Sequence, residues 1–466
     1  MAALAYQLNY PRFRTVLPPA THGLNLSPDD STDLTKAHSP TSAASAEPSS
    51  LGSMPRTGVW LVGAKGGVAT TVIVGSLAVC AGLARPIGML TAAEECRGLP
   101  LTALDALVFG GHDIRTMTVR ESAEQLYREI GTLRREWLDA LDAQLRALET
   151  NFRPGVLYHS GRAIEALSTS LSEPTGAGSP PRARAVVDRI ASDLREFAQT
   201  HQLERVVVVN LASTEPPVDH SPLQNSAAGI EKLLESPPRT GAPATSYLRA
   251  SSLYAIAAAR CGCPYLNFTP SPAALLPGIA EMFTAARLPF MGSDGKTGET
   301  LVKSTLAPMF RMRQLRVLSW QGYNILGDRD GLVLADAENK KSKTDTKDKL
   351  LHEQLGYPLH THVGIDYVPS LNDWKTAWDH IHFEGFLGNR MVMQFVWQGC
   401  DSVLAAPLVL DLVRFLALAH ARGESGPQPH LSAYFKSPFA MREHDLTKQF
   451  AKLEEYIELV RASLPR

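Results

Sequence analysis

Short apolar runs alternate with small-residue stretches along most of the chain. Residues 59–62 are apolar and stop at glycines, and residues 206–209 are four consecutive valines. Runs of this kind predict strands that are buried on both faces, as in a parallel sheet. Residues 70–83 and 254–260 carry the small and apolar side chains of closely packed helices. The alternation predicts an α/β fold with a mostly parallel sheet.

The same patterns predict further elements between these segments. Residues 86–90 form the next apolar stretch and are expected to be the second strand of the sheet. Residues 122–148 mix charged and apolar positions at helical spacing, which predicts one long, partly solvated helix. Two more short runs, at residues 265–268 and 316–320, predict additional strands. Residues 174–184 are rich in Pro, Gly and Ser and predict a loop.

The two ends of the chain differ from each other in composition. Residues 17–56 are rich in Pro, Ser, Thr and Ala, and they hold too few large apolar side chains to offset the entropy lost on ordering. They predict a flexible leader, with an arm that orders on assembly as the alternative. Residues 403–419 are strongly apolar but contain Asp411 and Arg414, so they predict a buried helix rather than a membrane span.

Charge and cysteine content limit the classes of function. The 466-residue chain has a formal net charge of -1, which gives no electrostatic footprint for nucleic acid or an anionic membrane. Its five cysteines are odd in number and scattered, which favours a reducing compartment over a disulfide framework. The N-terminus lacks the pattern of a secretory signal. We therefore expect a cytoplasmic protein that binds neither nucleic acid nor membrane.

A glycine-rich turn follows the first predicted strand. Glycines allow the backbone to approach a pyrophosphate closely, and the amides of the following helix point at the anion. The alternative for this segment is a plain strand–helix turn. Glu94 and Glu95 are candidates for the acidic group that holds the adenosine ribose, and exposed loop acids are the alternative for them. The order of residues is not that of a Walker loop, since no Gly-Lys-Ser/Thr closes the turn. The candidate cofactor-binding residues of the turn are Gly63, Gly66, Gly67, Val68, Ala69 and Thr70.

Four polar loops rich in Lys, Asp and Asn follow in the middle of the chain. They lie at residues 267–272, 292–303, 323–331 and 339–349. Lysines at converging loops can bind a phosphate and stabilise a developing alkoxide or enolate, and a lysine crowded by other cations can exchange protons near neutral pH. Taken singly, each lysine is more often a solvated surface charge.

Together these loops resemble the myo-inositol-1-phosphate synthase family, especially its archaeal and bacterial branch. The resemblance rests on the stretch Asp294 to Thr300, on Tyr323 to Gly331, on the Ser-Lys pairs around Lys343 and Lys347, and on Asp401 to Pro407. It implies that the catalytic residues are Lys296, Lys343, Lys347 and Lys375. It implies that the substrate and phosphate contacts are Asn267, Asp294, Thr297, Gly298, Lys303, Asn324 and Asp330. It also implies NAD contacts at Asp113, Ser213 and Thr214.

The resemblance also implies an activity and an assembly. The family converts glucose 6-phosphate into inositol 3-phosphate with NAD, through oxidation at C5, enolisation, aldol cyclisation and reduction, and so serves inositol and phospholipid biosynthesis. It implies a homotetramer, and its archaeal-type loops leave room for a divalent metal or a monovalent cation that the sequence does not identify. The alternatives are another NAD-dependent sugar-phosphate dehydrogenase and a non-catalytic sensor of NAD or sugar phosphate.

The expected architecture is a Rossmann-like NAD-binding domain with a second α/β catalytic and oligomerisation domain. The predicted divisions are a leader at 1–56, the NAD-binding domain at 57–250, the second domain at 251–404, and a C-terminal segment at 405–466 that returns to the first domain.

Overall fold

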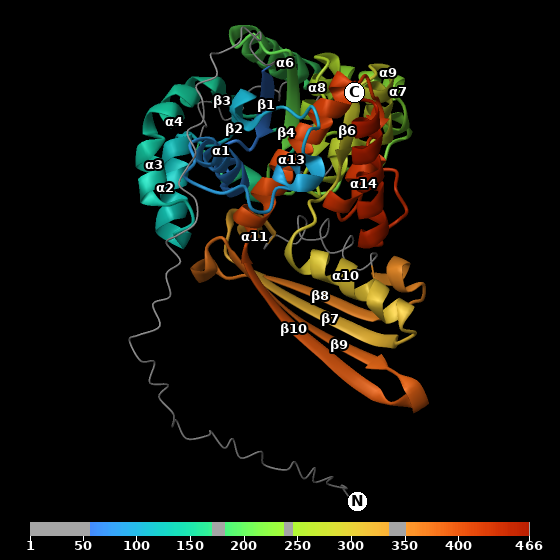
Figure 1. Ribbon diagram of the computed structural model, residues 1–466. Helices are drawn as coiled ribbons and strands as arrows, with labels where there is room; N and C mark the ends of the chain where they lie inside the picture. The colour runs from blue at the N-terminus through green and yellow to red at the C-terminus, as the bar shows by residue number, and fades with distance from the viewer. Residues whose placement is uncertain (1–55, 170–181, 237–245, 335–350, 466) are drawn as a thin grey trace, which may run out of the picture. The chain divides into compact units, whose positions relative to one another are not determined.

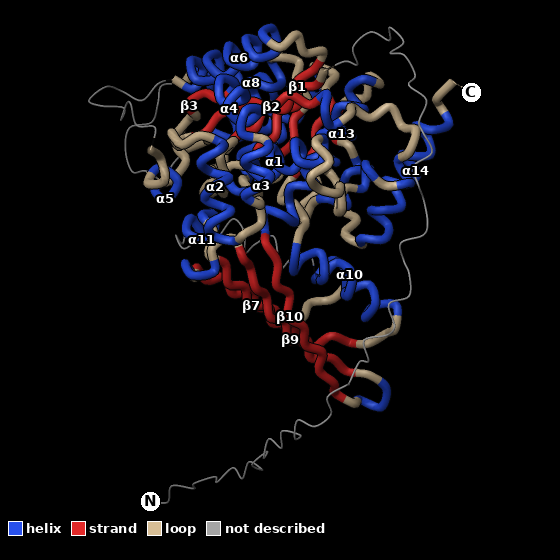
Figure 2. The backbone as a smooth tube through the Cα atoms, turned by 60° about the vertical axis from the view of Figure 1, so that its left-hand side comes forward, coloured by secondary structure: helices blue, strands red, loops and turns tan. Residues whose placement is uncertain are grey.

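Two β-sheets with their covering helices make up the part of the chain that the structure describes (Figures 1 and 2). The structure is a computed structural model, and it describes residues 56–169, 182–236, 246–334 and 351–465. The predicted leader therefore lies outside the described residues except for Arg56, and so does most of the predicted loop at 174–184.

The described residues of the first sheet form seven parallel strands in the order β11-β6-β5-β4-β1-β2-β3. The six strands β3-β2-β1-β4-β5-β6 have the order typical of a Rossmann-like sheet, with the change of direction between β1 and β4. The strands are β1 Thr57–Val62, β2 Leu107–Asp113, β3 Phe152–Pro154, β4 Arg205–Asn210, β5 Tyr265–Asn267, β6 Pro289–Gly292 and β11 Gly426–Pro427.

Helices cover both faces of this sheet because its strands are apolar on both sides. Along β1, Val59 and Leu61 pack into one core and Trp60 and Val62 into the other. The first core is covered by α1 Gly67–Cys80, α2 Val119–Ile130, α3 Arg135–Ala140, α4 Asp142–Leu148, α13 Asp401–Ala421 and α14 Leu446–Ala462. The second is covered by α6 Ala183–Thr200, α7 Ala227–Glu235, α8 Ala250–Arg260 and α9 Pro277–Ala285, and the short α5 spans Arg162–Glu165.

Two predictions are wrong, one for a strand of the first sheet and one for a helix that covers it. Residues 86–90 are not a strand: they enter a series of short 3-10 turns, with Gly88 at a φ of +90°, and the second strand is β2 instead. The predicted helix at 122–148 is broken into α2, α3 and α4, because Gly131 ends α2 in the left-handed conformation at φ 69°. A glycine at that position favours a helix end over continuation.

The second sheet has four strands among the described residues, in the order β10-β9-β7-β8. Strand β8 is parallel to β7, whereas β9 is antiparallel to both β7 and β10. This sheet is therefore mixed, and the expectation of a mostly parallel sheet holds for the first sheet alone. Helix α10 lies along one of its faces (Figure 1). The elements are α10 Gly298–Met312, β7 Arg316–Leu326, α11 Arg329–Leu334, β8 His360–Tyr367, β9 Trp374–Glu384 and β10 Arg390–Cys400.

The chain crosses between the two sheets at different residues from those expected. Strands β5 and β6 belong to the first sheet, although the sequence assigned residues 251–292 to the second domain. Helix α13 packs against α1, and β11 extends the first sheet, so the C-terminal segment lies against it. Among the described residues, α13 is the helix long and apolar enough to cross a membrane, but most of it is buried in the first core.

Candidate active site

A cavity of ≈ 520 Å³ opens at the carboxyl ends of the strands of the first sheet. The size is that of a typical small-molecule or cofactor site, and the position is where α/β sheets bind ligands. Its wall begins with Val62, Asp113 and Asn210, which end β1, β2 and β4. Residues 327–332 and 367–375 of the second sheet's loops form the opposite side. Both sheets therefore contribute to one site.

The glycine turn forms the floor of the cofactor side. Gly63 has a φ of +81°, and a Cβ at this position would lie 3.0 Å from the backbone Cα of Ala212. The turn closes through a hydrogen bond from the amide of Gly66 to the carbonyl of Gly63, and α1 begins at Gly67. The helix therefore presents its free amides and its positive end to the cavity, as anion binding requires.

Asp113 closes the second strand and fixes the turn. Its Oδ2 accepts a hydrogen bond of 2.7 Å from the backbone amide of Lys65, and its Oδ1 accepts from the backbone and side chain of Arg115. An acidic residue at the end of the second strand is the usual partner of the adenosine ribose. Asp113 occupies this position, while Glu94 and Glu95 lie in a 3-10 turn before the strand. The residues of the turn thus fit a dinucleotide.

Two lysines line the other end of the cavity. Lys375, at the start of β9, has its Nζ 3.9 Å from Oδ2 of Asp401. Lys436 has its Nζ 2.8 Å from Oδ1 of Asp294, and both of these side chains are buried. The Oδ2 of Asp294 is buried and has no hydrogen-bond partner among the described residues, so it can accept from a ligand hydroxyl. The pair offers one cation and one acceptor to a polyol phosphate.

The sequence did not indicate Lys436, and the backbone shows why. Residues 434–437 run antiparallel to residues 293–296, joined by hydrogen bonds from Lys296 N to the carbonyl of Tyr434 and from Lys436 N to the carbonyl of Asp294, each 2.7 Å. A bridge between Gly295 and Phe435 lies between them. About 140 residues of sequence separate the two segments of this contact. No local pattern predicts a pairing over such a separation.

A group of carboxylates lies beside Lys375. Asp328, Asp330, Asp373 and Asp401 all line the cavity. Burial, together with the charges of Asp330 and Asp401, raises the pKa of Asp328 to about 7. In the described part of the chain, no group of three or more His, Cys, Asp or Glu side chains is arranged to hold a metal ion. The sequence left open a divalent metal or a monovalent cation, and the described residues assign no site to either.

Comparison with known proteins identifies the family. The family model described as myo-inositol-1-phosphate synthase, which is named for NAD binding, matches residues 57–458. The chain belongs to the myo-inositol-1-phosphate synthase family. Inositol-3-phosphate synthase 1 of Bacteroides thetaiotaomicron is 34% identical over 86% of this chain and 94% of its own length. Inositol-3-phosphate synthase isozyme 1 of Arabidopsis thaliana is 30% identical over 78% of this chain and 75% of its own.

The fold agrees with a solved structure that carries the same name. Inositol-3-phosphate synthase from Caenorhabditis elegans superposes with a TM-score of 0.75 at 22% identity, covering 87% of this chain and 86% of the other. NAD is the cofactor of the myo-inositol-1-phosphate synthase family.

Most of the expected cofactor contacts line the cavity of this family member. Gly63, Gly66, Gly67, Val68, Asp113, Ser213 and Thr214 do so. Ala69 is instead buried in the first core, and the hydroxyl of Thr70 bonds that of Ser122 at 2.9 Å. These two residues support the turn from behind.

The expected substrate contacts divide in the same way. Asp294, Thr297, Asp330 and Lys375 line the cavity, while Lys343 and Lys347 lie outside the described residues. Asn267 is fully buried behind the wall and bonds Asn210 and Ser293. Asn324 is buried in β7, with its Nδ2 3.4 Å from the carbonyl of Gly364. Gly298, at a φ of +53°, lies against Trp397.

Lys303 is far more buried than the sequence suggested. Its Nζ lies 2.5 Å from Oε1 of Glu299 and 3.3 Å from Oδ1 of Asp379, and Trp320 also donates to Asp379 at 2.6 Å. These groups lie between α10 and the second sheet. Lys303 is not among the described residues that line the cavity, so its visible partners are structural rather than a phosphate.

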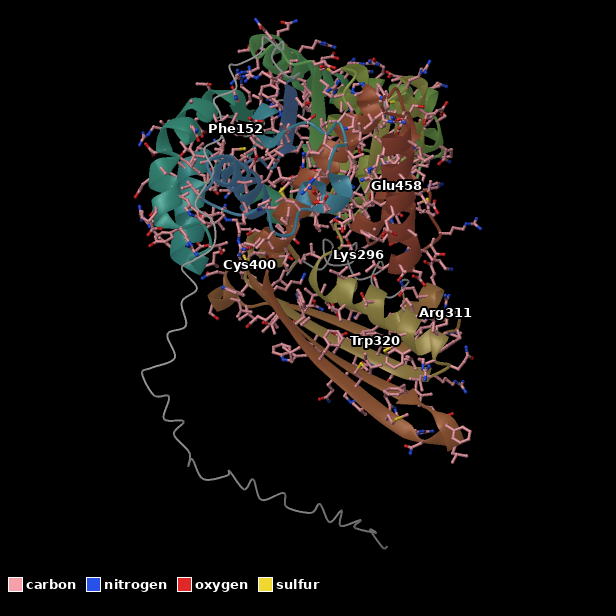
Figure 3. The ribbon with its side chains drawn as sticks, in the orientation of Figure 1. Phe152, Lys296, Arg311, Trp320, Cys400 and Glu458 are labelled. Atoms are coloured by element: carbon pink, nitrogen blue, oxygen red, sulfur yellow. The ribbon has the colours of Figure 1, made fainter. Side chains whose placement is uncertain are left out.

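Lys296, the first catalytic candidate, lies next to the cavity but faces away from it. Its neighbours Gly295 and Thr297 line the wall, whereas its own ammonium donates a 2.6 Å hydrogen bond to Oε1 of Gln449 on α14. Figure 3 shows Lys296 between the end of α14 and α10. Burial and the charge of Lys436 lower the pKa of Lys296 to about 7.

Proposed function

We propose that this protein is an inositol-3-phosphate synthase that converts D-glucose 6-phosphate into 1D-myo-inositol 3-phosphate. One observation carries the proposal: a single cavity joins a dinucleotide turn to two lysines and a set of carboxylates. An oxidation and a carbon–carbon bond formation can then take place on one bound substrate. Release of an intermediate between the steps is unnecessary.

The reaction is redox-neutral and needs a cofactor that stays in place. NAD, when held by the glycine turn and Asp113, would supply the oxidation at C5 and the reduction that follows ring closure. The ketone at C5 makes the proton at C6 acidic, and the resulting enolate closes the ring by attacking the C1 aldehyde. Asp113 and the amides at the start of α1 would hold the cofactor at the carboxyl end of the sheet.

The lysines meet the negative charges that develop on oxygen. Lys375 and Lys436 face the cavity and can stabilise the alkoxide at C5 and the enolate oxygen. Lys343 and Lys347 remain candidates for stabilising these oxygens or for binding phosphate. Lys296 remains a candidate for proton exchange at the cavity wall. Thr297, whose hydroxyl lies 3.3 Å from Oδ1 of Asp401, and Asp330, which accepts from Thr214 at 3.3 Å, position the loops around the substrate.

Turnover with a trace of cofactor tests this function. Purified protein is incubated with glucose 6-phosphate and NAD at one hundredth of the substrate concentration (about 1%, an amount that a net oxidation would exhaust). We expect inositol phosphate far in excess of NAD, measured by phosphorus NMR. NADH that accumulates in step with product would indicate a dehydrogenase instead, and binding of both ligands without product would indicate a sensor.

We further infer a homotetramer that forms through the second sheet and works in the cytoplasm. The central part of the face of this sheet opposite α10 presents uncharged side chains, namely Ser319, Gln321, Tyr323, His360, His362, Trp378, His380, His382, Val392, Gln394 and Val396. We call this set the open face. Charged residues of the same face lie at its two ends, with Arg316, Glu384 and Arg390 at one end and Asp366 at the other. The uncharged centre can meet its own copy across a two-fold axis without repulsion. The five cysteines are free, which suits a reducing compartment.

A further inference from the structure

The ammonium of Lys296 is held by a residue from the far end of the chain. Lys296 is 2% exposed and Gln449 is 0% exposed, and a 2.6 Å hydrogen bond joins Nζ of the lysine to Oε1 of the glutamine. A buried lysine usually has a carboxylate as its partner, because an isolated charge is costly away from water. A neutral amide partner favours the uncharged amine more than a carboxylate would.

The amide of Gln449 is fixed so that its oxygen faces the lysine. Its Nε2 donates a 2.6 Å hydrogen bond to the backbone carbonyl of Glu443, which leaves Oε1 for Lys296. Asp445 caps α14 one turn earlier by accepting from the amides of Thr447 and Lys448. The start of α14 is therefore anchored, and the position of Gln449 follows from it.

The charged groups around Lys296 come from two other segments. Lys436 adds a positive charge nearby, and it is itself paired with Asp294 at 2.8 Å. On the side of α14, Glu443 contributes its backbone carbonyl to Gln449 rather than its carboxylate to the lysine. Among the described residues, the ion pair that Asp294 makes is with Lys436.

We propose that Gln449 is a positioning residue that holds Lys296 without a counter-charge, so that this buried lysine is an uncharged amine in the working enzyme. Through this contact, α14 controls the charge of the loop that forms the substrate wall. The proposal rests on the proposed function, since its measure is turnover of glucose 6-phosphate. The lowered pKa of Lys296, about 7, agrees with the geometry. Activity should then fall as the pH drops below neutrality and Lys296 takes up a proton.

Two variants of one residue separate charge control from packing. Gln449→Glu places a carboxylate against the ammonium, and Gln449→Met keeps the volume without an acceptor for the ammonium. We expect the acid limb of the kcat/KM profile to move up by one pH unit or more in Gln449→Glu, a fall of about tenfold at pH 7 that is mostly regained at pH 9. In Gln449→Met the limb should move down, because the ammonium loses its hydrogen-bond acceptor.

Several outcomes would overturn the proposal. Equal losses of activity in both variants at every pH would mean that Gln449 acts through packing alone. An unchanged kcat/KM profile against pH in Gln449→Glu would mean that Gln449 does not control the charge of Lys296. NAD binding, followed by fluorescence, should change less than about twofold in each variant, since the turn that binds it lies elsewhere. If Gln449→Glu does not fold, an unshifted or raised limb in Gln449→Met refutes the idea. Absence of turnover in the unmodified protein would instead refute the proposed function.

Discussion

The lysines around the cavity differ in their ion-pair and hydrogen-bond partners, and these partners indicate different roles. Lys436 is paired with Asp294 at 2.8 Å, so its positive charge is stabilised. Lys375 lies 3.9 Å from Asp401, a looser contact that leaves its donors available to a ligand. Lys296 faces an amide and has a lowered pKa. We therefore assign the titration near neutral pH to Lys296.

Removal of Lys436 should abolish most turnover. Lys436→Ala deletes a cation at the cavity and leaves Asp294 buried without its partner. We expect a fall in kcat of about a hundredfold or more, the scale seen when one oxyanion-stabilising group is lost. Binding of NAD, measured by fluorescence titration, should remain within a few-fold. Lys448→Ala, which removes an exposed lysine of α14, is the control; comparable activities for the two variants would exclude a role for Lys436.

The sequence supplied part of this site and missed the rest for a physical reason. The glycine turn, Asp113, Asp294, Thr297 and Lys375 come from local motifs, and the structure places them in the cavity wall. Lys436 enters the site through backbone pairing across about 140 residues, which no local pattern encodes. The phosphate role of Lys303 stays a prediction, and its buried carboxylate partners were not visible in the sequence because Asp379 lies on a distant strand.

At the scale of elements, the glycine turn owes its shape to close backbone approach. Gly63→Ala would place a Cβ 3.0 Å from the Cα of Ala212 and force a side chain into a φ of +81°. We expect NAD affinity to fall at least about tenfold because the amides of α1 would shift away from the phosphates. Gly82→Ala imposes a similar φ, +70°, in open space. Equal effects of the two substitutions on NAD affinity would contradict a specific role for the turn.

Lys303 links α10 to the second sheet, and its loss should reduce stability. Lys303→Met leaves Glu299 and Asp379 buried with uncompensated charge, which costs about 3–5 kcal/mol in comparable buried pairs. We expect a lower Tm by calorimetry, whereas Lys232→Met, at an exposed position on α7, should leave the Tm unchanged. An unchanged Tm with weakened binding of glucose 6-phosphate would restore the phosphate role predicted from the sequence.

The elements that could be predicted are those whose burial is uniform. The valine run of β4 and the apolar α13 are recognisable because both faces of each are buried. Strands β9 and β10 escaped notice because one face of their sheet is open, and histidines and tryptophans interrupt the simple alternation. The break at Gly131 depends on a single backbone conformation rather than on periodicity. Local pattern therefore predicted the first sheet better than the second.

At the scale of the whole molecule, the open face should decide the state of assembly. Trp378 and Val396 are paired across β9 and β10 and are 44% and 63% exposed. Charged side chains there would oppose their own copies across a two-fold axis. We expect the double variant Trp378→Arg, Val396→Arg to give smaller species than the parent by light scattering. Ile87→Arg, at a position that is 72% exposed among the turns beside the first sheet, should not. A parent protein that is monomeric at all concentrations would contradict the tetramer.

The antiparallel contact between residues 293–296 and 434–437 has a consequence for how the protein is made. During synthesis, a ribosome has released both sheets' central strands long before it reaches Lys436. The cavity wall is incomplete, and Lys296 cannot contact Gln449, until the start of α14 has left the ribosome. A chain cut short by a premature stop codon before Lys436 therefore lacks one side of the substrate wall.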